Sequence, residues 1–229
     1  MEPGPLGSGA RTWNVSVGSG NGRPWPAAHN PGGMDVDQPQ HGPANTVRGS
    51  VYIATSLDGF IAREDGAIDW LCESSDQPGE DDGYQAFFDS VDALVMGRNT
   101  YDLVRGFDAW PYGTKPVIVL TSRPLDIPDE LRDRISTLSG APTEIARRLS
   151  ERGLKHVYVD GGKTIQGFLT AGLIQRMTIT RVPVLIGTGI PLFGAVPHDI
   201  ELRHVETRTY DNGLVQSTYD VVPRASAGA

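Results

Sequence analysis

The chain has 229 residues, of which 38% are hydrophobic and 21% charged, and this is enough apolar material for one well-packed domain. Its net charge of −8 argues against a basic nucleic-acid surface, and no apolar run approaches the ~20 residues of a membrane span. The single cysteine, Cys72, cannot form an internal disulfide, and the N-terminus lacks the pattern of a signal peptide. We therefore expect a cytoplasmic protein that binds neither nucleic acid nor membrane.

The first 45 residues are rich in glycine and proline and carry almost no periodic apolar pattern. Such a segment cannot bury enough surface to offset the entropy lost on ordering. We predict that residues 1–45 are a disordered tail, or an upstream extension if translation starts near Met34. The alternative is a partner-binding arm that carries Trp13 and Trp25. One domain is then expected over residues 46–223, followed by a disordered end at 224–229.

From residue 50 onward, short apolar runs that predict strands alternate with amphipathic runs that predict helices. Strands are expected at 50–55, continuing at 60–62, and at 92–96, 115–122, 134–139 and 155–160. Helices are expected at 84–91, 99–104, 141–153 and 163–172. The last part is β-rich, with strands at 175–187, 201–210 and 213–222 and a hairpin turn at "DNG".

This alternation predicts an α/β fold of three layers, in which helices cover both faces of a mostly parallel sheet with an antiparallel C-terminal hairpin. The stretches "RMTITRVPVLI" and "LVQSTYDVV" are long and rich in β-branched residues, and we expect them to be edge strands. A bare edge of this kind favours a homodimer in which the partner covers it. The alternative is that the hairpin packs within its own subunit and that Pro183 blunts the edge.

Three predicted strands end in residues that suit an anion. They are followed by Gly97–Thr100, by Thr121–Arg123 and by Gly161–Thr164. Glycine lets a phosphate approach the backbone, helix starts offer N–H groups, and arginine and hydroxyl side chains add donors. Since ligands of parallel sheets bind beyond the carboxyl ends of the strands, one ligand with spaced phosphates would explain all three turns. Each turn alone is equally well explained as a capped helix start.

Several familiar sites are absent from the sequence. "GGKT" is similar to the end of a Walker A loop, but that pattern requires a glycine at position 157, where Val157 stands. No GxGxxG pattern follows the first strand. The histidines lack the paired spacing of metal ligands and Cys72 has no ligand partner, so no metal is expected.

The motifs together resemble the dihydrofolate reductase superfamily. "VMGRNTYD", "VLTSR" and "VDGGKTIQGFL" are similar to the three turns that hold NADPH phosphates in that superfamily. "IATSLDGFIA" and "IDWL" are more similar to the reductase domain of bacterial riboflavin biosynthesis, whose relatives are commonly dimers. "PVLIGTGIPLF" is typical of the standalone members of that group. The resemblance spans about residues 47–222.

The resemblance implies NADPH as the cofactor and hydride transfer to a C=N or C=O bond of a small substrate. The residues implied in binding the NADPH phosphates are Gly97, Arg98, Thr100, Thr121, Ser122, Arg123, Gly161, Gly162, Lys163, Thr164 and Ile165. The backbones of Ala54 and Ile61 correspond to positions that hold the nicotinamide carboxamide. Asp58 and Trp70 would lie near the nicotinamide and the substrate and are the catalytic candidates, although a turn role for Asp58 and a core role for Trp70 stay open.

Dihydrofolate reductase also carries a pterin-binding carboxylate in the helix before "VMGR". The corresponding position here is Gly83 or Tyr84, and the nearby Asp81 and Asp82 suit the N-terminal charge of that helix. We therefore expect a reductase of the 5-amino-6-(5-phosphoribosylamino)uracil type. The alternatives are a dihydrofolate or pterin reductase, a non-catalytic NADPH-binding regulator, and a nucleotide- or phosphosugar-binding module without redox chemistry.

Overall fold

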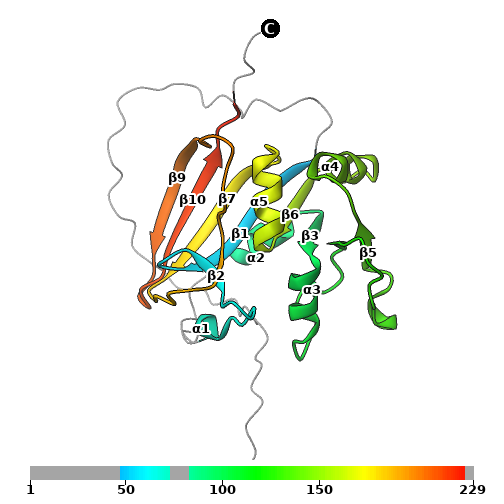
Figure 1. Ribbon diagram of the computed structural model, residues 1–229, viewed down its shortest axis with the longest axis horizontal. Coiled ribbons are helices and arrows are strands. Elements are labelled where there is room, and N and C mark those ends of the chain that lie inside the picture. Colours follow the sequence, from blue (N-terminus) through cyan, green and yellow to red (C-terminus); the bar gives the residue numbers. More distant parts are fainter. Residues whose placement is uncertain (1–46, 73–82, 225–229) are drawn as a thin grey trace, which may run out of the picture.

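The computed structural model describes residues 47–72 and 83–224 (Figure 1). The predicted tail at 1–45 lies outside the described residues, as do Asp81, Asp82 and residues 225–229.

A mixed sheet with the strand order β5-β4-β3-β6-β1-β7-β10-β9 crosses the molecule (Figure 1). Its strands are β1 (Arg48–Ser56), β3 (Ala93–Gly97), β4 (Val117–Leu120), β5 (Ile135–Leu138), β6 (His156–Asp160), β7 (Ile174–Val182), β9 (Leu202–Thr209) and β10 (Val215–Val221). All neighbouring pairs from β5 to β7 are parallel, whereas β10 is antiparallel to both β7 and β9. The short strands β2 (Phe60–Ala62) and β8 (Ile190–Pro191) pair with each other beside this sheet.

Helices cover both faces of the sheet, as the sequence predicts. They are α1 (Asp69–Cys72), α2 (Tyr84–Ser90), α3 (Arg98–Arg105), α4 (Pro142–Glu151) and α5 (Gly162–Thr170), with a 3₁₀ turn η1 (Asp129–Leu131). Ile145 and Leu149 of α4 and Phe168 of α5 are buried against one face. Tyr101 and Val104 of α3 are buried against the other, where α2 adds partly buried aromatic side chains. Within residues 47–72 and 83–224, no helix is long and apolar enough to cross a membrane.

The edge strand differs from the expected one. β7 lies between β1 and β10, and β10 lies between β7 and β9, so the prediction that residues 176–186 and 214–222 form the edge is wrong. The edge on this side of the sheet is β9, with β5 at the opposite edge, and all 8 residues of β9 are exposed. Charged side chains interrupt "LRHVETRT", as is typical of an edge strand, whereas the β-branched β7 is internal. β7 also ends at Val182, because Pro183 has no N–H to continue the ladder.

The strands β6 and β1 separate toward their carboxyl ends. Their ladder joins only Arg48–Ser50 with His156–Tyr158, whereas β1 pairs with β7 as far as Ser56 and β6 pairs with β3 as far as Asp160. The helix that follows β6 is α5, and α2, which follows β1, packs on the opposite face. Adjacent strands whose helices lie on opposite faces mark the switch point at which open α/β sheets bind ligands.

Candidate active site

The turn between β6 and α5 is built from two glycines that leave no room for side chains. Gly161 is the N-cap of α5 with φ 89°, a left-handed value that favours glycine, and a Cβ at this position would overlap the Thr100 hydroxyl. A Cβ on Gly162 would lie 3.1 Å from Ile61 Cδ1 and 3.2 Å from the Pro191 carbonyl oxygen. The backbone at this turn is therefore packed closely by three other segments.

The start of α5 leaves backbone donors available. The N–H of Ile165 donates to the Gly161 carbonyl at 2.9 Å, and this is the first hydrogen bond of the helix. The N–H groups of Gly162, Lys163 and Thr164 precede it and have no acceptor within the helix, and no side chain caps them. The side chain of Ile165 is fully buried in the core on the face of the sheet that α4 and α5 cover, which we call the α5 side; the other face, covered by α2 and α3, is the α2 side. The first turn of α5 thus offers three adjacent N–H groups to an anion.

The turn between β3 and α3 meets this first turn. Gly97 is the N-cap of α3, and a Cβ on it would lie 3.1 Å from Thr164 Oγ1. The Thr100 hydroxyl in turn lies against Gly161. Since β3 and β6 are neighbours in the sheet, the predicted residues Gly97, Thr100, Gly161 and Thr164 come together at one point.

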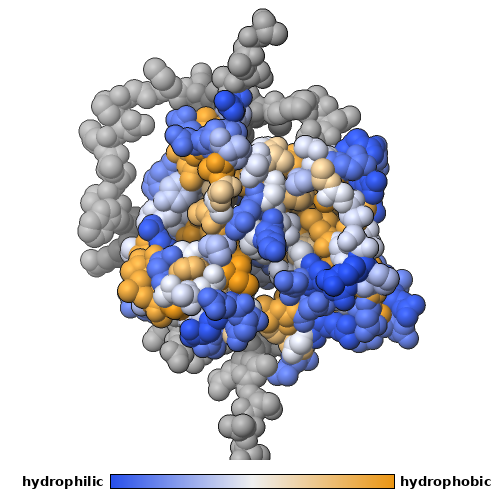
Figure 2. Space-filling view, in the orientation of Figure 1, coloured by the Kyte–Doolittle hydropathy of each residue, from blue (hydrophilic) through white to orange (hydrophobic). Residues whose placement is uncertain are grey.

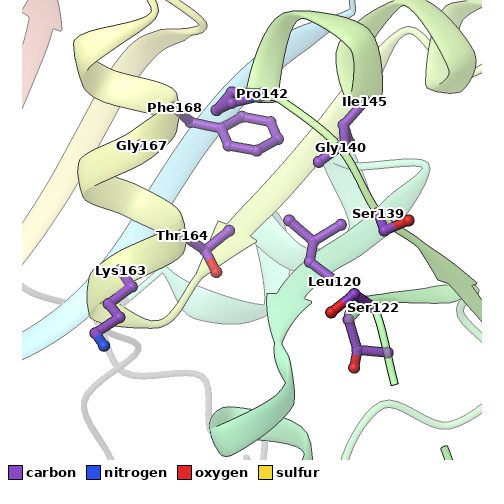
Figure 3. A pocket seen from close by; sticks show the side chains of 11 residues that line it. Leu120, Ser122, Ser139, Gly140, Pro142, Ile145, Lys163, Thr164, Gly167 and Phe168 are labelled. Atoms are coloured by element: carbon purple, nitrogen blue, oxygen red, sulfur yellow. The ribbon is translucent and has the colours of Figure 1, made fainter. Parts of the chain in front are cut away.

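A cavity of about 320 Å³ opens beside these turns, between α5 and α4 (Figures 2 and 3). Its lining residues are Leu120, Thr121, Ser122, Ser139, Gly140, Pro142, Ile145, Lys163, Thr164, Gly167 and Phe168. Phe168, Ile145 and Leu120 face one another across it, with Lys163 and Ser122 on either side of its lower end (Figure 3). The cavity therefore combines apolar walls with a rim of hydroxyl groups and one ammonium group.

The β5–α4 turn also lines this cavity, which was not predicted. Ser139 and Gly140 follow β5, and Pro142 is the first residue of α4. "LSGAP" repeats the signal of the other turns, a polar residue and a glycine between a strand and a helix, so it could have been found.

The split between β1 and β6 exposes backbone groups of β1. The Tyr158 hydroxyl donates to the Tyr52 carbonyl across the split at 2.7 Å. Because the N–H and C=O of a strand residue face the same neighbour and alternate along the chain, Ala54 presents its own pair on the same side as Tyr52. The ladder with β6 has already ended at Ser50. The predicted backbone position Ala54 thus faces the split.

Asp160, the last residue of β6, is another residue of the site that was not predicted. Tyr158 packs into the α2-side core and Val159 into the α5-side core, so Asp160 faces the α2 side. Its carboxylate accepts the Gly161 N–H at 2.8 Å. Burial raises the pKa of Asp160 to about 6. The signal was available as an acidic residue between an apolar strand and two glycines, a position where a perturbed carboxyl indicates function.

The model of the RibD C-terminal domain matches residues 50–216. The chain belongs to this family, which is that of the reductase domain of riboflavin biosynthesis. YwjB from Bacillus subtilis (strain 168), an uncharacterized protein, is 37% identical over 165 residues, which are 72% of this chain and 92% of YwjB. The riboflavin biosynthesis protein RibD from Mycobacterium tuberculosis (strain H37Rv) is 32% identical over 147 residues, which are 58% of this chain and 41% of that protein.

Solved structures agree with this assignment to the RibD C-terminal domain family. The crystal structure of a putative riboflavin biosynthesis protein from Shewanella sp. PV-4 has a TM-score of 0.72 and 40% identity, and the match covers 77% of this chain and all of that one. Dihydrofolate reductase from Enterococcus faecalis, complexed with NADP(H), has a TM-score of 0.52 at 14% identity, covering 76% and 96% of the two chains. That likeness shows the shared fold alone.

In this RibD-type domain, the predicted cations differ in the contacts that their side chains make. Arg98 donates through Nη1 to the Pro124 carbonyl at 2.8 Å and pairs through Nε with Asp102 at 3.2 Å, so it holds the segment after β4. Arg123 is exposed, and its backbone is held in a turn by Thr121 Oγ1. Among the residues that the structure describes, the side chains of Arg123 and Lys163 form no ion pair. Lys163 is the cation that lines the cavity.

The two catalytic candidates occupy different environments. Both oxygens of the exposed Asp58 carboxylate accept loop N–H groups, from Ile186 at 3.3 Å and from Gly187 at 2.8 Å. Hydrogen bonds from Ser56 and from these amides hold the pKa of Asp58 below its usual range. Trp70 is 5% exposed, and its buried indole N–H has no acceptor within the described ranges. An indole N–H can only donate, so an acceptor from a ligand would satisfy it.

Proposed function

We propose that this RibD-type domain is an NADPH-dependent reductase of the 5-amino-6-(5-phosphoribosylamino)uracil reductase type. The observation that carries the proposal is one continuous path along the sheet. The carboxyl ends of β5, β4, β3 and β6 are consecutive neighbours and run from the cavity, past the glycine turns, to the split beside β1. An extended dinucleotide has the same order of parts: a flat base, phosphates and a second flat ring.

The residues present fit NADPH. The apolar walls Leu120, Ile145 and Phe168 would hold the adenine, and Lys163 with Ser122 would bind the 2′-phosphate at the rim. The three N–H groups at the start of α5, with the Thr100 and Thr164 hydroxyls beside them, would bind the diphosphate. The absence of Cβ atoms at Gly161 and Gly162 lets Thr100, Ile61 and Pro191 pack directly against this turn.

The split supplies groups for the reacting end. The backbone of Ala54, which faces the split, would hold the carboxamide of the nicotinamide ring. The family resemblance implies that Trp70 lies near the nicotinamide and the substrate, and its indole N–H, unpaired among the described residues, would donate to one of them. When bound, NADPH supplies the hydride. Burial raises the pKa of Asp160 to about 6, so this carboxyl on the α2 side of the split keeps its proton to a higher pH than an ordinary aspartic acid. It is our candidate for protonating the atom next to the one reduced.

The α2 side of the split favours a substrate other than dihydrofolate. Tyr84, at the position of the expected carboxylate, packs its ring against Tyr52 with centroids 5.5 Å apart. The acid of α2, Asp89, accepts a hydrogen bond from Gln85 one turn away, in an exposed pair. The aromatic rings and Asp160 suit a flat, polar heterocycle that carries a C=N or C=O bond.

Cofactor titration followed by turnover tests the proposal. NADPH should bind at least about tenfold more tightly than NADH, because a charge-assisted phosphate contact contributes about 1.5–3 kcal/mol. A ribosylaminopyrimidine substrate should then stimulate NADPH oxidation far more than dihydrofolate does. Binding of NADPH without turnover of pyrimidine, pterin or carbonyl substrates would identify a regulator instead. No binding of NADPH would refute the proposal.

We also infer a homodimer, which the exposed edge strand supports. β9 leaves one side of its backbone without a strand partner among the described residues, and Leu202 and Val205 are 40% and 44% exposed. A second copy would cover the same strand on both subunits. Light scattering during gel filtration should give twice the mass of the chain, and Val205→Glu should give the monomer mass. A wild-type monomer at micromolar concentration would contradict the inference.

A further inference from the structure

The turn after β1 and the loop after β7 are fastened together, and we call residues 56–62 and 183–192 together the strap. The Leu57 N–H donates to the Val184 carbonyl at 2.8 Å, and the Leu192 N–H donates to the Gly59 carbonyl at 3.0 Å. The bond at Gly59 continues into the ladder in which β2 pairs with β8. The two chain segments of the strap are therefore joined at both ends, at Leu57–Val184 and along the β2–β8 ladder.

The strap also forms a wall of the first turn of α5. Ile61 Cδ1 and the Pro191 carbonyl oxygen would be the nearest neighbours of a Cβ on Gly162. Gln166, one turn further along α5, donates through Nε2 to the carbonyls of Pro191 at 3.1 Å and Leu192 at 3.2 Å. A displacement of the strap would therefore act directly on the N–H groups at the start of α5.

Asp58 joins the two segments of the strap at its outer end. Its two carboxylate oxygens accept the consecutive N–H groups of Ile186 and Gly187. Gly187 has φ 77°, so the loop turns sharply where the carboxylate binds it. Hydrogen bonds to an ionised acceptor are stronger than neutral ones, and two on one carboxylate fix the loop in orientation as well as in position.

We propose that Asp58 is a positioning residue, whose carboxylate holds the strap against the start of α5 and so increases the affinity for NADPH. This inference rests on the proposed function. Both oxygens of Asp58 are already used by loop amides, which makes it a poor source of a proton. Asp160, on the α2 side of the split, has one hydrogen bond from its neighbouring amide and is the better placed carboxyl for that task.

The two roles for Asp58 predict different results. A positioning residue acts before chemistry, so its loss should raise the Kd and the KM for NADPH about tenfold and should change kcat much less. A proton donor acts in the chemical step, so its loss should lower kcat and leave the Kd for NADPH unchanged. Amide hydrogen exchange without cofactor gives a third readout, because it measures directly whether the Asp58 carboxylate protects the N–H groups of Ile186 and Gly187.

The experiment compares Asp58→Ala, Asp58→Asn and the control Asp65→Ala with the wild type. Asp65 is an exposed acid in the next turn, where it accepts the Ala67 N–H at 2.9 Å, outside the strap. Asp58→Ala should weaken NADPH binding about tenfold in a fluorescence titration and speed exchange at residues 186 and 187. Asp58→Asn, which keeps one acceptor oxygen, should fall between Asp58→Ala and the wild type, and Asp65→Ala should match the wild type.

Unchanged affinity in Asp58→Ala, or a loss confined to kcat, would overturn the inference while leaving the NADPH reductase intact. Failure of the wild type to bind NADPH would instead overturn the proposed function together with the affinity part of this inference. Amide exchange at residues 186 and 187 would then still test whether the Asp58 carboxylate holds the two segments of the strap together. If Asp58→Ala does not fold, the same measurements on Asp58→Asn decide, since its loss should be smaller but in the same direction.

Discussion

The turns β3–α3 and β6–α5 look alike in sequence but differ in what they leave open. "VMGRNT" and "VDGGKT" both place a glycine N-cap, a cation and a threonine after a buried strand. Gly97 has an ordinary φ of −74°, whereas Gly161 has φ 89°. The guanidinium of Arg98 is bound by its own chain, whereas Lys163 lines the cavity. The intramolecular contacts of the cation are therefore a feature in which the two turns differ.

The largest expected effect comes from the strand residue that precedes the first glycine of each turn, which is Asp160 in β6 and Met96 in β3. Asp160 and Met96 are register partners in the sheet, and only the β6 turn begins with a carboxyl. Asp160→Asn should lower kcat by about 10²–10⁴-fold with little change in the Kd for NADPH, because general acid catalysis contributes that much. Single-turnover oxidation of NADPH measures the effect. A variant within twofold of the wild type would mean that the proton comes from elsewhere.

The pH dependence of Asp160 supplies a matched check. Burial raises the pKa of Asp160 from 3.8 in the unfolded chain to about 6 in the folded protein. The neutral carboxyl therefore contributes its full stability below pH 3.8, and this contribution is lost as the pH rises through about 6. The wild-type kcat should fall over the same upper range, as the carboxyl loses its proton. Urea unfolding of Asp160→Asn should no longer show this loss of unfolding free energy between about pH 4 and 6. If the loss remains in the variant, it comes from another titrating group.

The glycines themselves give the next contrast. Gly161→Ala places a Cβ against the Thr100 hydroxyl and imposes a backbone strain of about 1–3 kcal/mol, so the free energy of unfolding should fall by about that amount. The displaced N–H groups at the start of α5 should also bind NADPH more than about tenfold less tightly. Gly97→Ala meets only the Thr164 side chain at 3.1 Å, which can rotate away, and should cost less than about tenfold. Fluorescence titration and thermal unfolding of both variants measure this. Equal losses would show that both turns bind the diphosphate equally closely.

The strand–turn–helix order, the three-layer fold and the three polar turns after strands were predictable because each depends on a local pattern. The identity of the edge strand was not, because strand order depends on how segments distant in sequence pair, and β-branched content alone does not separate an internal strand from an edge. The charges of "LRHVETRT" carried the better signal for that edge.

The orientations of side chains were the least predictable part of the site. Arg98 was expected to bind phosphate, and that role stays a prediction; its pairing with Asp102, four residues later at a helical spacing at which opposite charges pair, was not predicted. That local signal was available. The carbonyl of Pro124 was not, because a contact across 26 residues appears only in the fold. The hydrogen bonds of Asp58 to residues 186 and 187 depend on the fold in the same way.

The two cations should differ in what their removal changes. Lys163→Ala should weaken NADPH about tenfold and NADH little, because the lysine is the cation on the cavity rim. Arg98→Ala should weaken both cofactors to a similar and smaller extent, because it releases the segment at Pro124. The ratio of the two dissociation constants for each variant decides this. A lost NADPH preference in Arg98→Ala alone would reverse the assignment of the two turns.

The smallest effect is expected from the partner of Arg98. Asp102→Ala removes an exposed i,i+4 pair worth about 0.2–1 kcal/mol, so the melting temperature should fall by only a few degrees. The stronger bond from Arg98 to the Pro124 carbonyl stays, and the guanidinium should keep its place, so the NADPH preference should not change. Asp129→Ala, which removes the exposed pair with Arg132, is the matched control. If Asp102→Ala instead increases the NADPH preference above that control, then Asp102 is what keeps Arg98 from the cofactor, and the two turns differ by a single carboxylate.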